Sequence, residues 1–259
     1  MESQRVPTGI AGLDEMLHGG FLPQTANLVE GATGTGKTTL GMQFIQHGIA
    51  ARGEPGIILT FEAFPEHYYR DASAFGWDFP AHEAQNRLRV IMSSPEVTRA
   101  DLQQINGRLE RVAGQIGARR MLVDSLSHFD RLSADPVELR RITYEFINGL
   151  KRLGLTAVLT RENAALLGET PDSEEELAFV ADSVIMLRYV EIQCTVHRAL
   201  VVLKLRGSDH HKDIRQYAIT AHGLEVRQRF EGTQGLMSGT ATMTHAEAFV
   251  AAFLSPGTP

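Results

Sequence analysis

The stretch Gly31-Ala32-Thr33-Gly34-Thr35-Gly36-Lys37-Thr38 fits the pattern GxxxxGK[ST], which is typical of loops that cradle phosphate groups. Glycines let the backbone curl so that successive N–H groups point at phosphate oxygens. A helix that begins near Lys37 adds the positive end of its dipole. In this pattern the lysine reaches the β- and γ-phosphates, and the hydroxyl of Thr38 ligates magnesium. We therefore expect the loop from Gly31 to Thr39 to bind ATP with Mg²⁺.

The sequence on both sides of this loop supports the same interpretation. The apolar run Ala26–Glu30 precedes it as a candidate buried strand, and Thr38–Ala51 follows it as a candidate helix. Leu40, Phe44 and Ile45 recur in that helix at the spacing of a core-facing side. The alternative, a glycine-rich turn with an incidental lysine, does not account for this strand–loop–helix context.

Strands and helices alternate along the chain from about residue 25 to residue 190. Six short apolar segments have the composition of strands that are buried on both faces of a sheet: Ala26–Glu30, Gly56–Glu62, Leu88–Met92, Arg120–Asp124, Leu155–Thr160 and Ser183–Leu187. Helical patterns lie between them, including Thr98–Gly117, a helix from Asp135 to Gly154, and a short helix with Ser173 and Glu176 as its capping box. This alternation predicts an α/β fold whose mostly parallel sheet is flanked by helices.

The pattern changes after Val190. Three segments, Ala199–Arg206, Ile214–Thr220 and Leu224–Arg227, are joined without long helices, so we expect C-terminal antiparallel strands that extend the sheet. We assign residues 1–230 to one domain and residues 231–259 to a tail. The tail holds one possible helix, Thr244–Leu254, whose apolar side suits either a partner protein or packing on its own or a neighbouring subunit.

Composition narrows the function classes. The chain has 259 residues and a formal net charge of −6, which argues against a broad surface that coats nucleic acid. Its single cysteine, Cys194, excludes an internal disulfide and a cysteine-rich zinc site. The first residues lack the apolar stretch of a signal peptide, and no run approaches the roughly 18 apolar residues of a membrane helix. We expect a soluble cytoplasmic protein without a membrane partner.

A second acidic position completes the predicted site. Met121-Leu122-Val123-Asp124 is an apolar strand that ends in a carboxylate, which is the form of a Walker B element. Such strand ends are common, so we interpret this one as a Walker B element because the chain also contains the phosphate loop. We expect Thr38 and Asp124 to hold the magnesium ion together.

Further motifs flank the loop and follow one another from about Val6 to Val226. They are Val6-Pro7-Thr8-Gly9-Ile10-Ala11-Gly12-Leu13-Asp14, Gly19-Gly20-Phe21-Leu22-Pro23, Gly53-Glu54-Pro55-Gly56, Thr60-Phe61-Glu62, Asp71-Ala72-Ser73-Ala74-Phe75-Gly76-Trp77 and Leu203-Lys204-Leu205-Arg206-Gly207-Ser208-Asp209-His210. With these motifs the chain resembles the KaiC-like branch of the RecA superfamily of ATPases. The resemblance implies a RecA-like P-loop NTPase core, ATP bound between neighbouring subunits, and a homo-oligomer that is often a hexameric ring.

The resemblance also implies roles for particular residues. Glu62 matches the glutamate that activates the attacking water; without the family it would be an ordinary exposed strand-end glutamate. Lys204 and Arg206 match basic residues that reach into the next subunit's nucleotide site, where such cations stabilise charge on the transferring phosphoryl group. The alternative for this pair is a solvated basic face on an edge strand. Four residues that follow would approach the ribose and base of that neighbouring nucleotide: Ser208, Asp209, His210 and Lys212.

Two departures from the family bear on activity. Family members commonly have two adjacent glutamates where this chain has Glu62-Ala63, so hydrolysis could be slow. The chain also carries one ATPase domain where the cyanobacterial clock protein carries two, so a clock function does not follow. A metal site at His210-His211 is disfavoured because no third ligand is apparent.

Three functions remain in view. The first is an oligomeric ATPase that hydrolyses ATP slowly and couples its nucleotide state to an unknown regulatory protein. The second, motivated by Ala63, is a regulatory ATP-binding module without appreciable turnover. The third is a DNA-binding motor of the RecA type, which the acidic balance and the lack of interleaved aromatic and basic residues disfavour.

Overall fold

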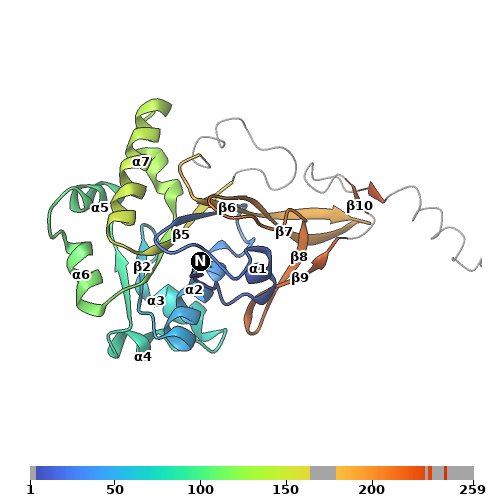
Figure 1. Ribbon diagram of the computed structural model, residues 1–259, viewed down its shortest axis with the longest axis horizontal. Helices are drawn as coiled ribbons and strands as arrows, with labels where there is room; N and C mark the ends of the chain where they lie inside the picture. The colour runs from blue at the N-terminus through green and yellow to red at the C-terminus, as the bar shows by residue number, and fades with distance from the viewer. Residues whose placement is uncertain (1–3, 164–178, 231–232, 235–241, 244–259) are drawn as a thin grey trace, which may run out of the picture.

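A single sheet of nine strands organises the chain, with β7, β8 and β9 at one end and β2 and β3 at the other (Figure 1). The computed structural model describes residues 4–163, 179–230, 233–234 and 242–243. The strand order is β3-β2-β4-β5-β1-β6-β7-β8-β9. The strands are β1 (Ala26–Gly31), β2 (Gly56–Thr60), β3 (Leu88–Met92), β4 (Arg120–Asp124), β5 (Thr156–Glu162), β6 (Ser183–Ile192), β7 (Thr195–Leu205), β8 (Arg215–Thr220) and β9 (Gly223–Arg229).

The strands from β3 to β6 in this order are all parallel, and β7, β8 and β9 are antiparallel. This confirms the predicted fold class. Strand β5 lies between β1 and β4, so the phosphate-loop strand and the strand that ends in Asp124 are next-nearest neighbours. Two short strands, β10 (Thr233–Gln234) and β11 (Thr242–Met243), form a separate antiparallel pair.

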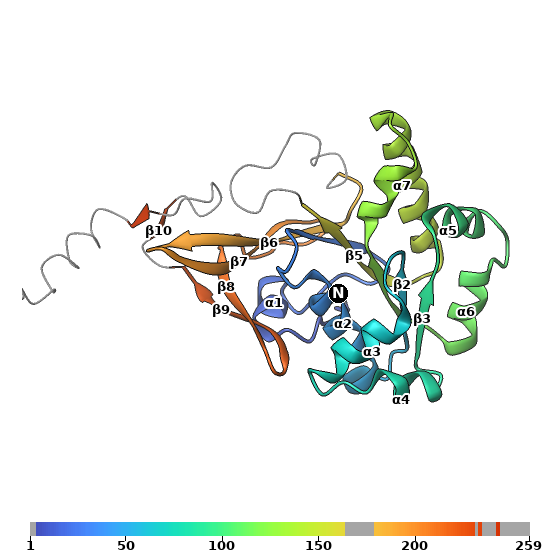
Figure 2. The ribbon, with the colours of Figure 1, turned by 180° about the vertical axis from the view of Figure 1, so that it is seen from behind.

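Helices cover both faces of the sheet because alternate strand residues bury in two separate apolar clusters. On one face lie α1 (Ala11–Met16), α2 (Lys37–His47), α3 (Pro65–Ser73) and α4 (Phe79–Ala84), and on the other lie α5 (Pro95–Leu102), α6 (Arg108–Ile116) and α7 (Pro136–Arg152). Figure 2 shows α3 and α4 beside β2 and β3. No helix of the described part of the chain is long and apolar enough to cross a membrane.

One predicted helix is wrong, since Thr98–Gly117 is divided into α5 and α6. The chain turns between them, where Asn106 adopts a φ of 56° and Ile105 is 95% exposed despite its helical spacing. The carboxylate of Asp101 accepts hydrogen bonds from the backbone N–H groups of Arg108 and Leu109. These groups begin α6 and have no partner within the helix, so Asp101 stabilises a new helix start.

Several strand ends also differ from the prediction, and two of these differences affect the site or the extent of the sheet. Strand β2 ends at Thr60, so Glu62 lies on the bend that follows it. Strand β6 continues past Leu187 to Ile192, because residues 188–192 pair with β7 across a turn in which Gln193 and Cys194 have positive φ. Pairing with β7 and the burial of Val190 against Ala199 sustain this extension. The predicted Ser173 capping box and the tail helix Thr244–Leu254 lie outside the described residues.

Candidate nucleotide-binding site

The predicted phosphate loop joins β1 to α2 at the carboxyl edge of the parallel strands. Gly34 and Gly36 have φ values of 79° and 97°, which side-chain-bearing residues rarely adopt. A Cβ atom at Gly31 would lie 2.5 Å from the carbonyl oxygen of Leu187, and one at Gly36 would lie 2.7 Å from Cδ1 of Ile219. The backbone of β6 therefore requires glycine at position 31, the positive φ favours it at position 36, and the curled backbone fits a phosphate cradle.

Lys37 and Thr35 hold the loop from inside. The ammonium of Lys37 donates to the carbonyl oxygens of Gly31 at 2.8 Å and Ala32 at 2.9 Å. Burial lowers the pKa of Lys37, while the carboxylates of Glu162 and Asp124 raise it by a smaller amount. The side chain of Thr35 is buried and donates to the same Ala32 carbonyl at 2.7 Å, so its hydroxyl supports the loop from within and does not line the adjoining cavity.

Thr38 and Asp124, the two residues expected to hold magnesium, lie within hydrogen-bond distance of each other. The hydroxyl of Thr38 donates to Oδ2 of Asp124 at 2.9 Å. The hydroxyl of Tyr68 donates to the same oxygen at 2.8 Å, and that of Thr160 donates to Oδ1. A hydroxyl and a carboxylate beside a phosphate loop are hard oxygen donors, which is the ligand type that magnesium prefers. These side chains therefore fit a magnesium site.

A cavity of about 470 Å³ opens beside the loop. It is lined by loop residues Thr33, Gly34, Gly36, Lys37, Thr38 and Thr39, and by residues from the neighbouring strand ends and α3, including Glu62, Tyr68, Arg70, Asp71, Asp124 and Glu162. Glu62 therefore lines the same cavity as Thr38 and Asp124, the two predicted magnesium ligands. The carboxylate of Glu62 is 80% exposed, and its Oε2 lies 3.1 Å from Nε2 of His128.

Glu162 and Tyr68 are residues of this cavity that the sequence analysis missed. Glu162 ends β5, and its carboxylate accepts a hydrogen bond from the hydroxyl of Thr33. Its backbone N–H donates to Oγ of Ser127 at 2.8 Å. The signal for Glu162 was its place in the charged pair Arg161-Glu162, which follows the apolar strand predicted at Leu155–Thr160. Tyr68 had no comparable signal, because its helix contacts the site only in three dimensions.

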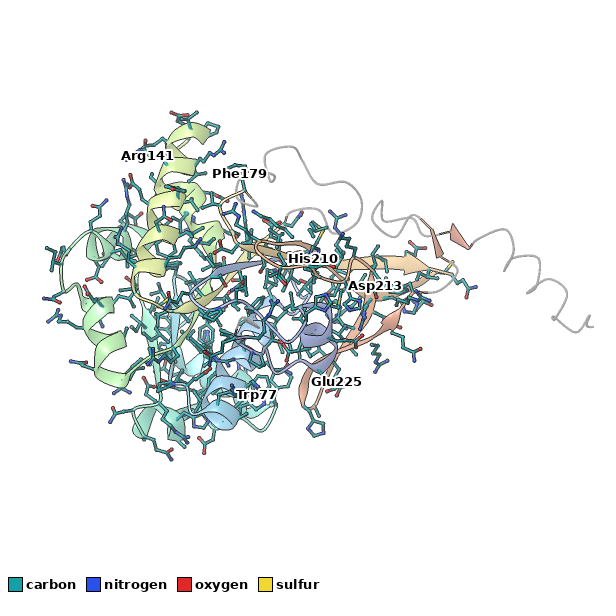
Figure 3. All side chains as sticks on the ribbon, in the orientation of Figure 1. Trp77, Arg141, Phe179, His210, Asp213 and Glu225 are labelled. Atoms are coloured by element: carbon teal, nitrogen blue, oxygen red, sulfur yellow. The ribbon has the colours of Figure 1, made fainter. Side chains whose placement is uncertain are left out.

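Lys204 and Arg206 lie at the opposite edge of the sheet from the loop. The end of β7 pairs with the first residues of β6, because Lys204 pairs with Val184. The ammonium of Lys204 donates to the carbonyl oxygen of Ala181 at 2.7 Å, and Arg206 lies 3.8 Å from Asp182. Both side chains also donate to the carbonyl oxygen of Phe179, which Figure 3 labels beside α7. They do not line the loop's cavity in the same chain.

Ser208, Asp209, His210 and Lys212 follow β7 at this same amino edge, and His210 is labelled in Figure 3. The hydroxyl of Ser208 accepts a hydrogen bond from Arg5 and donates to the Asp209 carbonyl at 2.9 Å. A backbone hydrogen bond from His210, with a smaller effect of Lys212, lowers the pKa of Asp209. These residues are therefore separated from the loop of their own chain, as Lys204 and Arg206 are.

Comparison with known proteins agrees with this geometry. The family model described as an ATPase, KaiC, matches residues 6–231. The circadian clock protein KaiC3 of Synechocystis sp. is 34% identical over 244 residues, which cover 93% of this chain and 47% of that protein. The KaiC proteins of Thermostichus vulcanus and Prochlorococcus marinus subsp. pastoris are 34% and 37% identical, over 92% and 87% of this chain and 45% of each relative.

The chain thus spans about half the length of the curated relatives that it matches. Their names refer to a circadian clock, and that function is a statement about those proteins. The matched residues 6–231 include the phosphate loop. The chain belongs to the KaiC family of ATPases.

Proposed function

We propose that this chain binds ATP with Mg²⁺ at the loop from Gly31 to Thr39 and hydrolyses it slowly in a homo-oligomer. The observation that carries this proposal is the glycine cradle beside the hydrogen-bonded pair of Thr38 and Asp124. A cradle of backbone N–H groups suits phosphate, and the adjacent oxygen donors suit its magnesium ion. When bound, magnesium neutralises charge that develops on the phosphate oxygens.

In this proposal Lys37 binds the β- and γ-phosphates, and Glu62 acts as general base. The carboxylate of Glu62 lines the same cavity as Thr38 and Asp124, and its high exposure leaves it open to a water molecule. Glu62 accepts a proton from this water while the water oxygen bonds to the γ-phosphorus and the bond from phosphorus to the ADP oxygen breaks. His128, 3.1 Å from Glu62, limits the directions that this carboxylate takes.

The position of the basic residues supports a site that two subunits share. Lys204 and Arg206 lie at the amino edge of the sheet, whereas the loop lies at its carboxyl edge. Cations that stabilise transferring phosphate must touch it, so these residues can act only on the nucleotide of an adjacent copy. A head-to-tail contact of this kind closes into a ring, for which the family resemblance favours six copies. Ser208, Asp209, His210 and Lys212 would contact the ribose and base there.

Phosphate release at saturating ATP tests hydrolysis. We expect wild type to release phosphate above the level of Lys37→Ala, which removes the phosphate contact and abolishes binding. Glu62→Gln keeps the size of the side chain but removes the base, so we expect it to bind ATP without turnover. Binding itself stabilises the fold by about 4 kcal/mol at a thousandfold excess of ATP over its dissociation constant. An unchanged melting temperature with Mg²⁺ and ATP would contradict the whole site.

One observation favours a second function, a regulatory module that binds ATP without turnover and signals occupancy to a partner protein. Ala63 stands where relatives commonly have a second glutamate, and it packs partly against the core. The site then offers one acid at this bend to orient water. Wild-type phosphate release that does not exceed that of Lys37→Ala, together with retained ATP binding, would favour this module over the ATPase.

A further inference from the structure

Tyr68 brings a hydroxyl group from α3 to the predicted magnesium site. The residue is 4% exposed, and its side chain belongs to the apolar cluster on the face of the sheet that α2 and α3 cover. Its hydroxyl donates to Oδ2 of Asp124 at 2.8 Å. A buried aromatic residue needs no hydroxyl in order to pack, so this group requires an explanation beyond the core.

Three hydroxyl groups surround Asp124. Thr38 and Tyr68 donate to Oδ2 at 2.9 Å and 2.8 Å, and Thr160 donates to Oδ1. These donors come from α2, α3 and β5, so the carboxylate is oriented from three elements. Hydrogen bonds to a charged acceptor are stronger than neutral ones, and together they fix the plane of the carboxylate.

Tyr68 differs from the two threonines that donate to Asp124. Thr160 also faces a second acceptor, the carbonyl oxygen of Val123, at 3.3 Å, and Thr38 is itself an expected magnesium ligand. Tyr68 also donates to Asp124, but it is not an expected magnesium ligand, and its ring is held in the core.

Asp124 and the helix that carries Tyr68 are both joined to the segment that carries Glu62. The hydroxyl of Thr60 donates to the carbonyl oxygen of Ala63 at 3.2 Å and accepts a hydrogen bond from the Ala63 N–H group at 3.2 Å. The N–H group of Phe61 donates to the carbonyl oxygen of Asp124 at 3.2 Å. Helix α3 begins directly after this bend, so the bend, Tyr68 and Asp124 form one connected unit.

We infer that Tyr68 is a positioning residue for magnesium, whose hydroxyl holds the Asp124 carboxylate in the orientation that receives the metal beside Thr38. This inference rests on the proposed function, because it assigns a role within the same nucleotide site. Removing a group that orients a metal-binding carboxylate lowers metal affinity, whereas removing a hydroxyl that serves packing alone changes stability but not metal dependence.

The test compares Tyr68→Phe with Tyr69→Phe. The first variant removes the hydroxyl from Asp124 and keeps the buried ring. The second removes the neighbouring hydroxyl, which donates to Glu83 of α4 and does not line the cavity. The measurement is the affinity for a fluorescent ATP analogue, mant-ATP, in EDTA and over a series of free Mg²⁺ concentrations. For Tyr68→Phe we expect the Mg²⁺ concentration that gives half of the affinity gain to rise about tenfold, with the EDTA value unchanged.

Each outcome of this comparison either supports or overturns the inference about Tyr68. An unchanged Mg²⁺ titration in Tyr68→Phe, or an equal shift in Tyr69→Phe, overturns the inference, and so does an equal loss of affinity in EDTA. If Tyr68→Phe melts below the assay temperature, Tyr68→Met is measured instead, because its flexible apolar side chain fills such sites without a hydroxyl. Failure of wild type to bind mant-ATP would refute the proposed function itself, so the two failures are distinguishable.

Discussion

At the residue scale, the buried charge of Lys37 lowers the free energy of unfolding in a loop that is expected to bind phosphate. Burial lowers its pKa in the folded chain, so the folded state holds this proton less tightly than the unfolded state does. The charged lysine therefore reduces the free energy of unfolding at neutral pH, and this penalty fades only as the pH rises through the folded pKa. Two loop carbonyls solvate the ammonium without a full counter-charge. A triphosphate would supply that charge, which couples binding to the stability of the loop.

Substitutions at Gly36 and Gly114 distinguish a backbone conformation that the phosphate loop needs from ordinary helix propensity. Gly36 has a φ of 97° and no room for a Cβ beside Ile219, whereas Gly114 lies exposed in α6 with open space around it. We expect Gly36→Ala to destabilise the nucleotide-free protein by at least about 1–2 kcal/mol, from the strained backbone alone, and to weaken ATP binding. Gly114→Ala should stabilise it by about 0.5–1 kcal/mol. Urea unfolding measures both, and a Gly36→Ala protein as stable as wild type would contradict the strain argument.

At the scale of elements, the start of β4 is joined to three other segments by one buried cation. The guanidinium of Arg120 is fully buried, lies 2.7 Å from a carboxylate oxygen of Glu54, and donates to the carbonyl oxygens of Pro7 at 2.7 Å and Phe44 at 3.0 Å. It also stacks over the Phe44 ring at 4.5 Å. The sequence analysis treated this residue only as the first position of a strand.

We expect Arg120→Met to destabilise the protein by about 3 kcal/mol, because it leaves the Glu54 carboxylate and two carbonyl groups without their partner. The neighbouring Arg119 is exposed, so Arg119→Met serves as the matched control and should change stability by less than about 0.5 kcal/mol. The free energies come from urea unfolding monitored by circular dichroism. Equal changes in the free energy of unfolding for the two variants would mean that the buried ion pair of Arg120 and Glu54 does not stabilise the protein.

The antiparallel strands also support the phosphate loop. Tyr217 of β8 is buried and its hydroxyl donates to the carbonyl oxygen of Thr35, while Ile219 packs against Gly36. Strand β8 is thus a structural part of the site, although it lies about 180 residues after the loop in sequence. A displacement of β8 would therefore alter the phosphate loop through the direct contacts of Tyr217 and Ile219.

At the scale of the whole molecule, the two edges of the sheet carry complementary halves of one proposed site. Strands that run parallel place all their carboxyl ends at one edge, and the antiparallel β7 places its own end at the other. The distance between these edges keeps Lys204 and Arg206 from the loop of the same chain. Copies of the chain that associate head to tail would bring the two halves together.

Mixed oligomers test this arrangement. Lys37→Ala lacks the loop contact, and the double variant Lys204→Ala/Arg206→Ala lacks the cations, so we expect each protein alone to be inactive. In rings assembled at random from equal amounts, about one quarter of the interfaces pair an intact loop with intact cations, so about a quarter of wild-type phosphate release should return. Co-expression with two affinity tags isolates the mixed species. Mixed rings that stay as inactive as their parents would rule out the shared site.

The sequence by itself determined the phosphate-loop motif, the α/β fold class and the succession of nine strands along the chain. These features follow from local requirements, because a backbone that curls around phosphate needs glycine and a buried strand needs an apolar run. Family motifs indicated Glu62, Lys204 and Arg206, whose roles stay predictions.

Only the tertiary structure decided which distant side chains meet. Tyr68 and Glu162 reach the cavity, and Thr160 reaches Asp124, because β5 lies between β1 and β4 and α3 packs beside them, which no local pattern encodes. The division of the predicted helix at residues 103–107 depends on Asp101 receiving the next helix start. Hydrogen-bond partners of this kind are chosen by the packing of elements, and packing is a property of the whole sheet rather than of any one segment.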